Sequence, residues 1–279
     1  MPKNLVKKNQ VTNKNDSESG IRIQKMLAQS GVGSRREIEK AIIEKRISVN
    51  NILAKIGQSV SYKDRIIFDG KLINLNSNIS LPRILIYNKP EGEIVSESDP
   101  KGRATVFDHL PQIKNAKWIS IGRLDFNTSG LLIFTSYGEF ANRLMHPRYE
   151  IEREYSVRVL GELTDNQISQ LRAGIRLEDG LARFEQISLK GGEGSNHWYQ
   201  VILKEGRNRE VRRLFEFFNI TVSRLMRVRF GGIALPTNLK KRSYIELSEK
   251  EVLNTLSKFN VNDAKFNKTQ ITKVKKNRR

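Results

Sequence analysis

After residue 81 the chain alternates short apolar runs with amphipathic stretches, and this pattern constrains the fold more than any other feature. The apolar runs have strand character and read ILIYNK, LLIFTS, EYSVRVL, WYQVILK and YIEL. Helical periodicity falls between them, over residues 139–145, 165–173 and 208–218. Neighbouring strands with inserted helices predict an α+β domain, residues 81–250, built on a mainly antiparallel mixed sheet. About 165 residues are enough to bury a core of this kind.

A smaller unit is expected before it, over residues 20–75. Ile23, Met26 and Leu27 share one helical face, and Gly31 ends that first helix. Ser34 with Glu37 three residues later forms a capping box for a second helix. Short strand patterns follow, and a polar link over residues 74–80 separates this unit from the larger domain.

The charge balance narrows the class of partner. The chain has 279 residues, with 50 Lys plus Arg against 30 Asp plus Glu, for a formal net charge of +20. Such a charge attracts polyanions, either nucleic acid or an anionic membrane surface. The membrane is the weaker candidate, because no apolar run approaches the roughly 18 residues of a spanning helix and the first residues lack a secretory apolar stretch. Residues 1–19 are expected to be a disordered basic arm. Residues 251–279 are expected to be a basic tail, which starts as a helix candidate after Ser248 and ends in the disordered stretch KFNKTQITKVKKNRR.

Metal chemistry is not expected from this composition. The chain has no cysteine and only three histidines, which lie far apart in the sequence. The chain lacks the glycine-rich cofactor loop after a first strand that would indicate a methyltransferase. It also lacks the carboxylate cluster that would indicate a metal nuclease. We expect a cytoplasmic protein that binds nucleic acid, without a metal or other cofactor.

The stretch SIGRLDFNTSGLLIFTSYG, residues 120–138, places polar residues between two strand-like runs. Asp125, followed by Asn127 and Gly130, is compatible with an ordinary turn. Tyr155 alternates with Val157 and Val159 on one strand face, so it could be a core aromatic with a satisfied hydroxyl.

The helix expected over residues 208–218 carries three arginines with different orientations. At 100° per residue, Leu214, Phe215 and Phe218 form a stripe centred close to Val211. Arg209 and Arg213 then point away from the stripe toward solvent or phosphate, whereas Arg212 lies at its margin. An arginine there calls for a carboxylate partner, and Asp125 is the natural candidate. An ordinary surface ion pair is the alternative for Arg212.

The sequence GVGSRREIEKAIIEKRISVN within residues 20–75 resembles the S4 RNA-binding domain. Asn51 departs from the glycine common in that family, but asparagine also tolerates a left-handed turn. The alternative is a solvated helical face with incidental basic residues. The resemblance implies that a basic face of this unit binds RNA, with the candidates Arg22, Lys25, Arg35, Arg36, Lys40 and Arg46.

Three motifs behind this unit resemble the pseudouridine synthases that modify ribosomal RNA: GRLDFNTSGLLIFTSYGEFANRLMHP, EREYSVRV and EGRNREVRRLFEFF. The resemblance implies that Asp125 is the catalytic aspartate, that Tyr155 lies against the target base and that Arg212 pairs with Asp125. It implies isomerisation of a uridine without a cofactor, with Asp125 acting as a nucleophile or as a base on the sugar. The uridine must be flipped out of its helix, and Arg123 is the implied filler of the gap.

The stretch GGEGSNHWYQVILKEGRNREVRRLFE resembles the members of this family that act on large subunit (23S) ribosomal RNA. Small subunit (16S) specificity and a noncatalytic assembly factor that binds ribosomal RNA remain as alternatives. We expect a monomer. Further RNA-binding candidates in the larger domain are Arg143, Arg148, Arg209 and Arg213.

Overall fold

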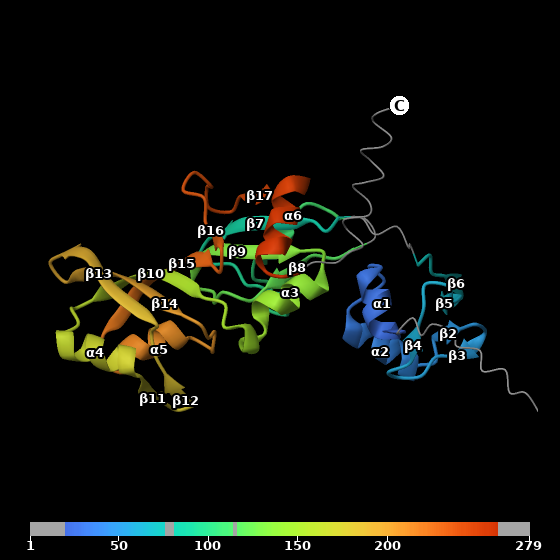
Figure 1. Cartoon of the computed structure of the whole chain (residues 1–279), viewed down its shortest axis with the longest axis horizontal. Coiled ribbons are helices and arrows are strands. Elements are labelled where there is room, and N and C mark those ends of the chain that lie inside the picture. Colours follow the sequence, from blue (N-terminus) through green and yellow to red (C-terminus); the bar gives the residue numbers. More distant parts are fainter. Residues whose placement is uncertain (1–19, 76–80, 114–115, 262–279) are drawn as a thin grey trace, which may run out of the picture. The chain divides into compact units, whose positions relative to one another are not determined.

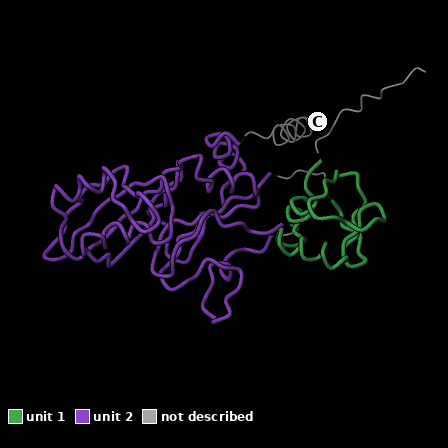
Figure 2. The backbone as a smooth tube through the Cα atoms, turned by 90° about the horizontal axis from the view of Figure 1, so that it is seen from below, with its two compact units in different colours: residues 1–77 green, residues 78–279 purple. Residues whose placement is uncertain are grey.

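The computed structural model describes residues 20–75, 81–113 and 116–261. The chain divides into two compact units, residues 1–77 and 78–279 (Figure 2). The division falls within the polar link expected at 74–80. The basic arm predicted for residues 1–19 and the part of the tail from residue 262 onward lie outside the described residues.

The first unit consists of two helices and short strands. Its elements are β1 (Ile21–Arg22), α1 (Ile23–Gln29), α2 (Arg35–Ile43), β2 (Ile47–Val49), β3 (Ile52–Leu53), β4 (Ser59–Val60), β5 (Ile66–Phe68) and β6 (Lys71–Leu72). The predicted capping box is confirmed: the Glu37 N–H donates to the Ser34 hydroxyl at 3.2 Å, and the Ser34 N–H donates to the Glu37 carboxylate at 2.6 Å. Buried Ile23, Leu27 and Ile38 join the two helices in one small core.

The second unit is built on a nine-stranded sheet with the order β13-β14-β10-β15-β9-β7-β17, to which β8 and β16 add short pairings (Figure 1). Its strands are β7 (Ile84–Lys89), β8 (Ile119–Ile121), β9 (Ser129–Thr135), β10 (Arg153–Leu160), β13 (Gln186–Glu193), β14 (Asn196–Leu203), β15 (Thr221–Phe230), β16 (Ile233–Ala234) and β17 (Tyr244–Glu246). A separate hairpin pairs β11 (Ile175–Leu177) with β12 (Gly180–Ala182). Of the described strand pairs in the large sheet, β9 with β15 is parallel and the others are antiparallel. The predicted mainly antiparallel mixed sheet is therefore confirmed.

The helices of the second unit are α3 (Gly138–Met145), α4 (Asp165–Ala173), α5 (Glu210–Glu216) and α6 (Glu249–Lys258), with the 3-10 turns η1 (Val106–His109) and η2 (Pro147–Tyr149). The helices α3 and α4 agree with the predicted ranges. Helix α5 is shorter than the predicted 208–218, because Arg209 has a left-handed backbone with φ of 49° and acts as its N-cap. Residues 207–210 therefore form a turn at the start of the helix, in which the Glu210 N–H donates to the Arg207 carbonyl at 3.4 Å.

Two apolar clusters cover the two faces of β7 and β9. Ile84 and Ile86 belong to one cluster, whereas Leu85 and Tyr87 alternate into the other. Helices α4 and α5 pack into the cluster that holds Tyr87, and α3 and α6 pack into the opposite one (Figure 1). Both faces of the central strands are thus buried.

Helix α6 extends the second unit beyond the boundary expected at residue 250. Val252, Leu256 and Phe259 are buried in the core, and the Phe259 ring meets that of Phe140 edge-to-face at 5.8 Å. The first part of the expected 251–279 tail is therefore folded against the unit. Its apolar residues recur at helical spacing, which agrees with the helix candidate that the sequence offered after Ser248.

Strand β15 was not predicted, and it determines the geometry of the site. It places Arg227 opposite Tyr155 of β10 on one side and beside Gly130 of β9 on the other. Gly130 has φ of +97°, and a Cβ there would collide with the backbone of Arg227. Glycine is required at this position because the two strands approach so closely.

Candidate active site

The loop between β8 and β9 presents Asp125 to solvent. The neighbouring Leu124 is buried, while Arg123 and Asp125 are exposed. The loop does contain a turn, in which the Thr128 N–H donates to the Asp125 backbone carbonyl at 3.0 Å. The turn uses the backbone of Asp125, and no hydrogen bond to its carboxylate occurs among the described residues. The side chain is therefore available for chemistry, contrary to the simple turn interpretation.

A buried lysine binds the backbone carbonyls of this loop. Lys89, at the end of β7, donates from Nζ to the backbone carbonyls of Pro90 at 2.9 Å, Asp125 at 3.1 Å and Thr128 at 2.8 Å. Burial lowers the pKa of Lys89 from 10.5 to about 8, although the charges of Glu93, Glu91 and Asp125 favour its protonated form. Two of these bonds fix the loop backbone at Asp125 and Thr128, and the third joins the loop to the end of β7 at Pro90. Sequence analysis did not single out Lys89, although a lysine that closes the apolar run ILIYNK is a visible anomaly.

Arg212 reaches the loop from helix α5, but not in the predicted way. Its Nη2 donates to the Asn127 carbonyl at 2.9 Å and its Nη1 to the Val222 carbonyl at 2.8 Å. No ion pair within 4 Å joins it to Asp125 in the described structure, so the predicted direct pairing is wrong. Burial lowers the pKa of Arg212, and the charge of Asp125 acts in the opposite sense. Arg212 therefore fastens the loop backbone and attracts the carboxylate from a longer distance.

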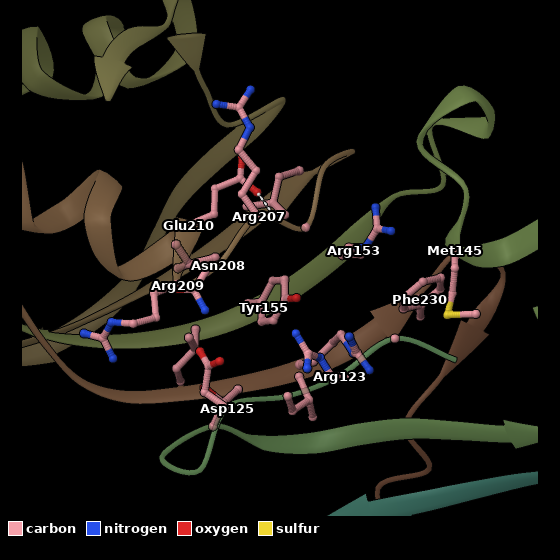
Figure 3. A pocket seen from close by; sticks show the side chains of 18 of the residues that line it. Arg123, Asp125, Met145, Arg153, Tyr155, Arg207, Asn208, Arg209, Glu210 and Phe230 are labelled. Carbon is pink, nitrogen blue, oxygen red and sulfur yellow. Dashed lines mark hydrogen bonds between the residues drawn. The ribbon is translucent and has the colours of Figure 1, made fainter. Parts of the chain in front are cut away.

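Asp125 and Tyr155 line the same cavity, which has a volume of about 480 Å³. Figure 3 shows the carboxylate of Asp125 directed toward the side of the cavity where Tyr155 lies, with Arg123 nearby. Tyr155 is 8% exposed and also contacts the main apolar cluster, so it is both a core residue and a wall of the cavity. The turn before α5 closes another side with Arg207, Asn208 and Arg209.

Two arginines of the cavity were missed by sequence analysis. Arg227 on β15 is 2% exposed and donates from Nε to the Leu131 carbonyl at 2.8 Å. Arg153 lies two residues before Tyr155 on β10 and is half-buried. The alternation of EREYSVRV, which placed Tyr155 inward, also places Arg153 on that face and could have identified it. Arg227 could not be placed, because β15 itself was not predicted.

The other RNA-binding candidates of the second unit differ in availability. Arg213 is held by the Asp179 carboxylate through two bonds of 2.8 Å, and Arg209 donates to Glu216 at 3.2 Å. Arg143 donates from Nε to the Phe259 carbonyl at 2.8 Å and stacks over the ring of Tyr149. Arg148 is exposed and contacts the hydroxyl of Tyr149. Arg143 and Arg213 thus have roles within the fold, which their positions in the sequence could not reveal.

In the first unit the candidates lie on or beside the two helices. Arg35, Arg36 and Lys40 are exposed on α2, and Lys40 meets Glu44 at 3.8 Å. Arg46 is held by Asp69 at 2.5 Å and Glu44 at 3.0 Å. Arg22 donates to the Gly57 carbonyl, while Lys25 is half-buried. Of the predicted set, α2 thus offers the most accessible positive charge.

Within the residues that the structure describes, no three His, Asp or Glu side chains gather as a metal site would require. The same part of the chain contains no helix that is both long and apolar enough to cross a bilayer.

The fold and the cavity define an RNA pseudouridylate synthase with an S4 domain in front, and the chain belongs to this family. The model of the RNA pseudouridylate synthase family matches residues 83–217, and that of the S4 domain matches residues 21–66. A solved structure described as a pseudouridylate synthase is 25% identical, with a TM-score of 0.58, and the match covers 84% of this chain and 99% of that one.

Among the relatives is Ribosomal large subunit pseudouridine synthase B of Pseudomonas aeruginosa, 52% identical over 84% of this chain and 61% of that protein. The synthase B of Yersinia pestis is also 52% identical, over 83% of this chain and 74% of its own length. The chain thus spans less than two thirds of the first relative's length. The expected resemblance to members that act on the large subunit is confirmed.

Proposed function

We propose that this chain converts a uridine of large subunit (23S) ribosomal RNA into pseudouridine. The observation that carries the proposal is the exposed carboxylate of Asp125, held on an anchored loop and facing the same cavity as Tyr155. A volume of about 480 Å³ falls within the range of small-molecule sites and is large enough for a flipped nucleoside. The choice of large subunit RNA is supported by the names of the relatives described above.

The reaction breaks the bond between N1 of uracil and C1′ of the ribose, turns the base and joins C5 to C1′. The proton that C5 loses is balanced by the proton that N1 gains, so the composition does not change and no cofactor is needed. Asp125 acts either as the nucleophile that holds the intermediate or as a base on the sugar. Tyr155 lies against the base, and Arg123 occupies the space that the flipped nucleotide leaves.

Docking of the RNA depends on the basic surfaces. Arg35, Arg36 and Lys40 of the S4 unit neutralise phosphates, and such contacts supply affinity without reading the sequence. We also propose that the chain acts as a monomer. Its ribosomal RNA substrate implies a cytoplasmic location. Sedimentation of the purified protein tests the monomeric state, and the distribution of the protein between cell fractions tests the cytoplasmic location.

The function is tested by mapping pseudouridines in both ribosomal RNAs from cells with and without the gene. One position of the 23S RNA should lose its pseudouridine, and expression of the wild-type chain, but not of Asp125→Asn, should restore it. A loss confined to 16S RNA would transfer the specificity to the small subunit. Unchanged maps would contradict enzymatic activity and favour an assembly factor.

A further inference from the structure

Two arginines meet at one end of the cavity without a carboxylate to neutralise them. The Cζ atom of Arg153 lies 4.9 Å from the centre of the Phe230 ring, and that of Arg227 lies 5.0 Å from the same centre. In Figure 3 Arg153 lies on the side of Tyr155 where Phe230 is found. Both cations therefore pack against one aromatic ring beside the proposed catalytic residues.

Most of their hydrogen bonds go to backbone carbonyls, and Arg227 is also hydrogen-bonded to the side chain of Tyr155. Arg153 donates from Nη1 to Ile151 at 2.9 Å and to Lys204 at 2.5 Å. Arg227 donates from Nε to Leu131, and its buried Nη2 has no acceptor within the described part of the chain. These bonds leave both guanidinium charges without a carboxylate at hydrogen-bond distance.

The pKa of Arg153 is lowered, mainly by burial. The neighbouring Tyr155 acts in the opposite sense, and the charge of Arg227 adds to the effect of burial. Glu210 and Glu205 favour the charged form of Arg153, but neither lies within 4 Å of it in the described structure. Glu210 instead accepts the N–H of Arg207 at 3.0 Å. Because an arginine stays protonated, two like charges remain desolvated against one aromatic ring, and an anion bound there would relieve the cost.

The ligand of the proposed function brings one kind of anion to this place. An RNA strand carries a phosphodiester on each side of every ribose, and Arg binds phosphate well because its fork of N–H groups matches the oxygens. Arg153 and Tyr155 stand two residues apart on the same face of β10, a spacing of about 6.6 Å along a strand. A nucleotide whose base lies against Tyr155 can therefore place an adjoining phosphate near Arg153.

We propose that Arg153, with Arg227 behind it, forms a subsite for a phosphodiester that adjoins the flipped uridine. Arg153 makes the direct contact, because it is half-exposed and keeps N–H groups that no carbonyl occupies. Arg227 contributes its charge from the interior and supports the Phe230 ring. The subsite rests on the proposed function. It adds a phosphate contact that positions the target nucleotide next to Asp125.

Arg158 provides a matched control for this proposal. It lies on the same strand, but its side chain is on the other face of β10, where it donates to the Ser223 hydroxyl at 3.0 Å and stacks near Trp198. Arg158→Gln removes the same charge as Arg153→Gln without changing the cavity. Arg153→Lys keeps a positive charge while losing the fork, and thermal unfolding of each variant identifies any loss of fold.

The test compares the affinity of the purified chain for uridine, uridine 5′-monophosphate and uridine 3′-monophosphate, measured by NMR titration. One monophosphate should bind the wild-type chain and Arg158→Gln about tenfold more tightly than uridine does. Arg153→Gln should bind all three ligands equally, and Arg153→Lys should retain part of the preference. These ligands need no turnover, so the result is separate from the detection of pseudouridine in RNA.

Equal binding of uridine and both monophosphates by the wild-type chain would overturn the subsite, even if pseudouridine is formed. An equal loss of preference in the folded Arg153→Gln and Arg158→Gln proteins would also overturn it, since a general effect of net charge would then be sufficient. A chain that discriminates through Arg153 but forms no pseudouridine would keep the subsite and refute the proposed function.

Discussion

Lys89→Met removes the buried cation beneath the loop that carries Asp125. The three carbonyls of Pro90, Asp125 and Thr128 would lose their donor, and each buried group left unpaired costs about 1–3 kcal/mol. The loss is partly offset, because a pKa that falls from 10.5 to about 8 corresponds to about 3 kcal/mol spent on burying the charge. We expect the variant to be less stable by about 3 kcal/mol at pH 7, with slower turnover because the loop is less constrained.

The stability gap should widen at alkaline pH. Because burial lowers the pKa of Lys89 to about 8 while an unfolded lysine titrates near 10.5, the unfolded state binds more protons between these values. The contribution of Lys89 to the free energy of unfolding of the wild-type chain therefore rises with pH across this window. Lys89→Met lacks this contribution, whereas all other groups titrate in both proteins. Urea unfolding at pH 7 and pH 10 should show the gap growing by about 2–3 kcal/mol.

Lys190→Met serves as the control, since Lys190 is exposed on β13. Its unfolding free energy should stay within about 0.5 kcal/mol of the wild-type value at both pH values. A gap between the wild-type chain and Lys89→Met that remains constant, or narrows, from pH 7 to pH 10 would refute the assignment of a buried, pKa-lowered ammonium to the loop.

Substitutions at three other residues and a deletion test the site. Asp125→Asn should eliminate pseudouridine formation while RNA affinity in filter binding stays within a few fold, because phosphate contacts elsewhere supply affinity; appreciable turnover would contradict its role. Tyr155→Phe should keep single-turnover activity that Tyr155→Ala loses, and equal full activity in both would leave Tyr155 as a core residue. Arg212→Lys should lower turnover at least about tenfold, since one ammonium cannot reproduce the fork that reaches Asn127 and Val222. Deleting residues 1–75 should reduce the salt slope of log affinity by about 0.7–0.9 per lost phosphate contact; an unchanged slope would exclude docking by the S4 unit.

The local elements of this protein followed from the sequence. Helices α3 and α4 were predicted because their apolar residues recur at helical spacing, and β7 because its apolar run has strand character. The GRLDFNTSG motif and its resemblance identified Asp125 as the candidate catalytic residue. These features depend on residues that are close together in the chain, so they can be predicted from the sequence pattern.

Strand β15 could not be predicted in the same way. Its sequence TVSRLMRVRF mixes arginines with apolar residues and lacks a clean alternation, since a bulge shifts its register against β10. The strand is stable because it lies between β9 and β10, which supply partners on both sides. Tertiary pairing thus overrode a weak local preference.

Tertiary structure also determined which partner each charged residue has. The helical projection placed Arg212 correctly at the edge of the apolar stripe, but its acceptors are the carbonyls of Asn127 and Val222. Backbone carbonyls occur at every residue, so a sequence gives no signal for the ones that a distant side chain will reach. The sequence by itself determined which residue types are available to the site and the faces of the elements that carry them. The meeting of Asp125, Tyr155, Arg153 and Arg227 around one cavity was decided by the fold, because it requires three segments far apart in the chain to come together in one sheet.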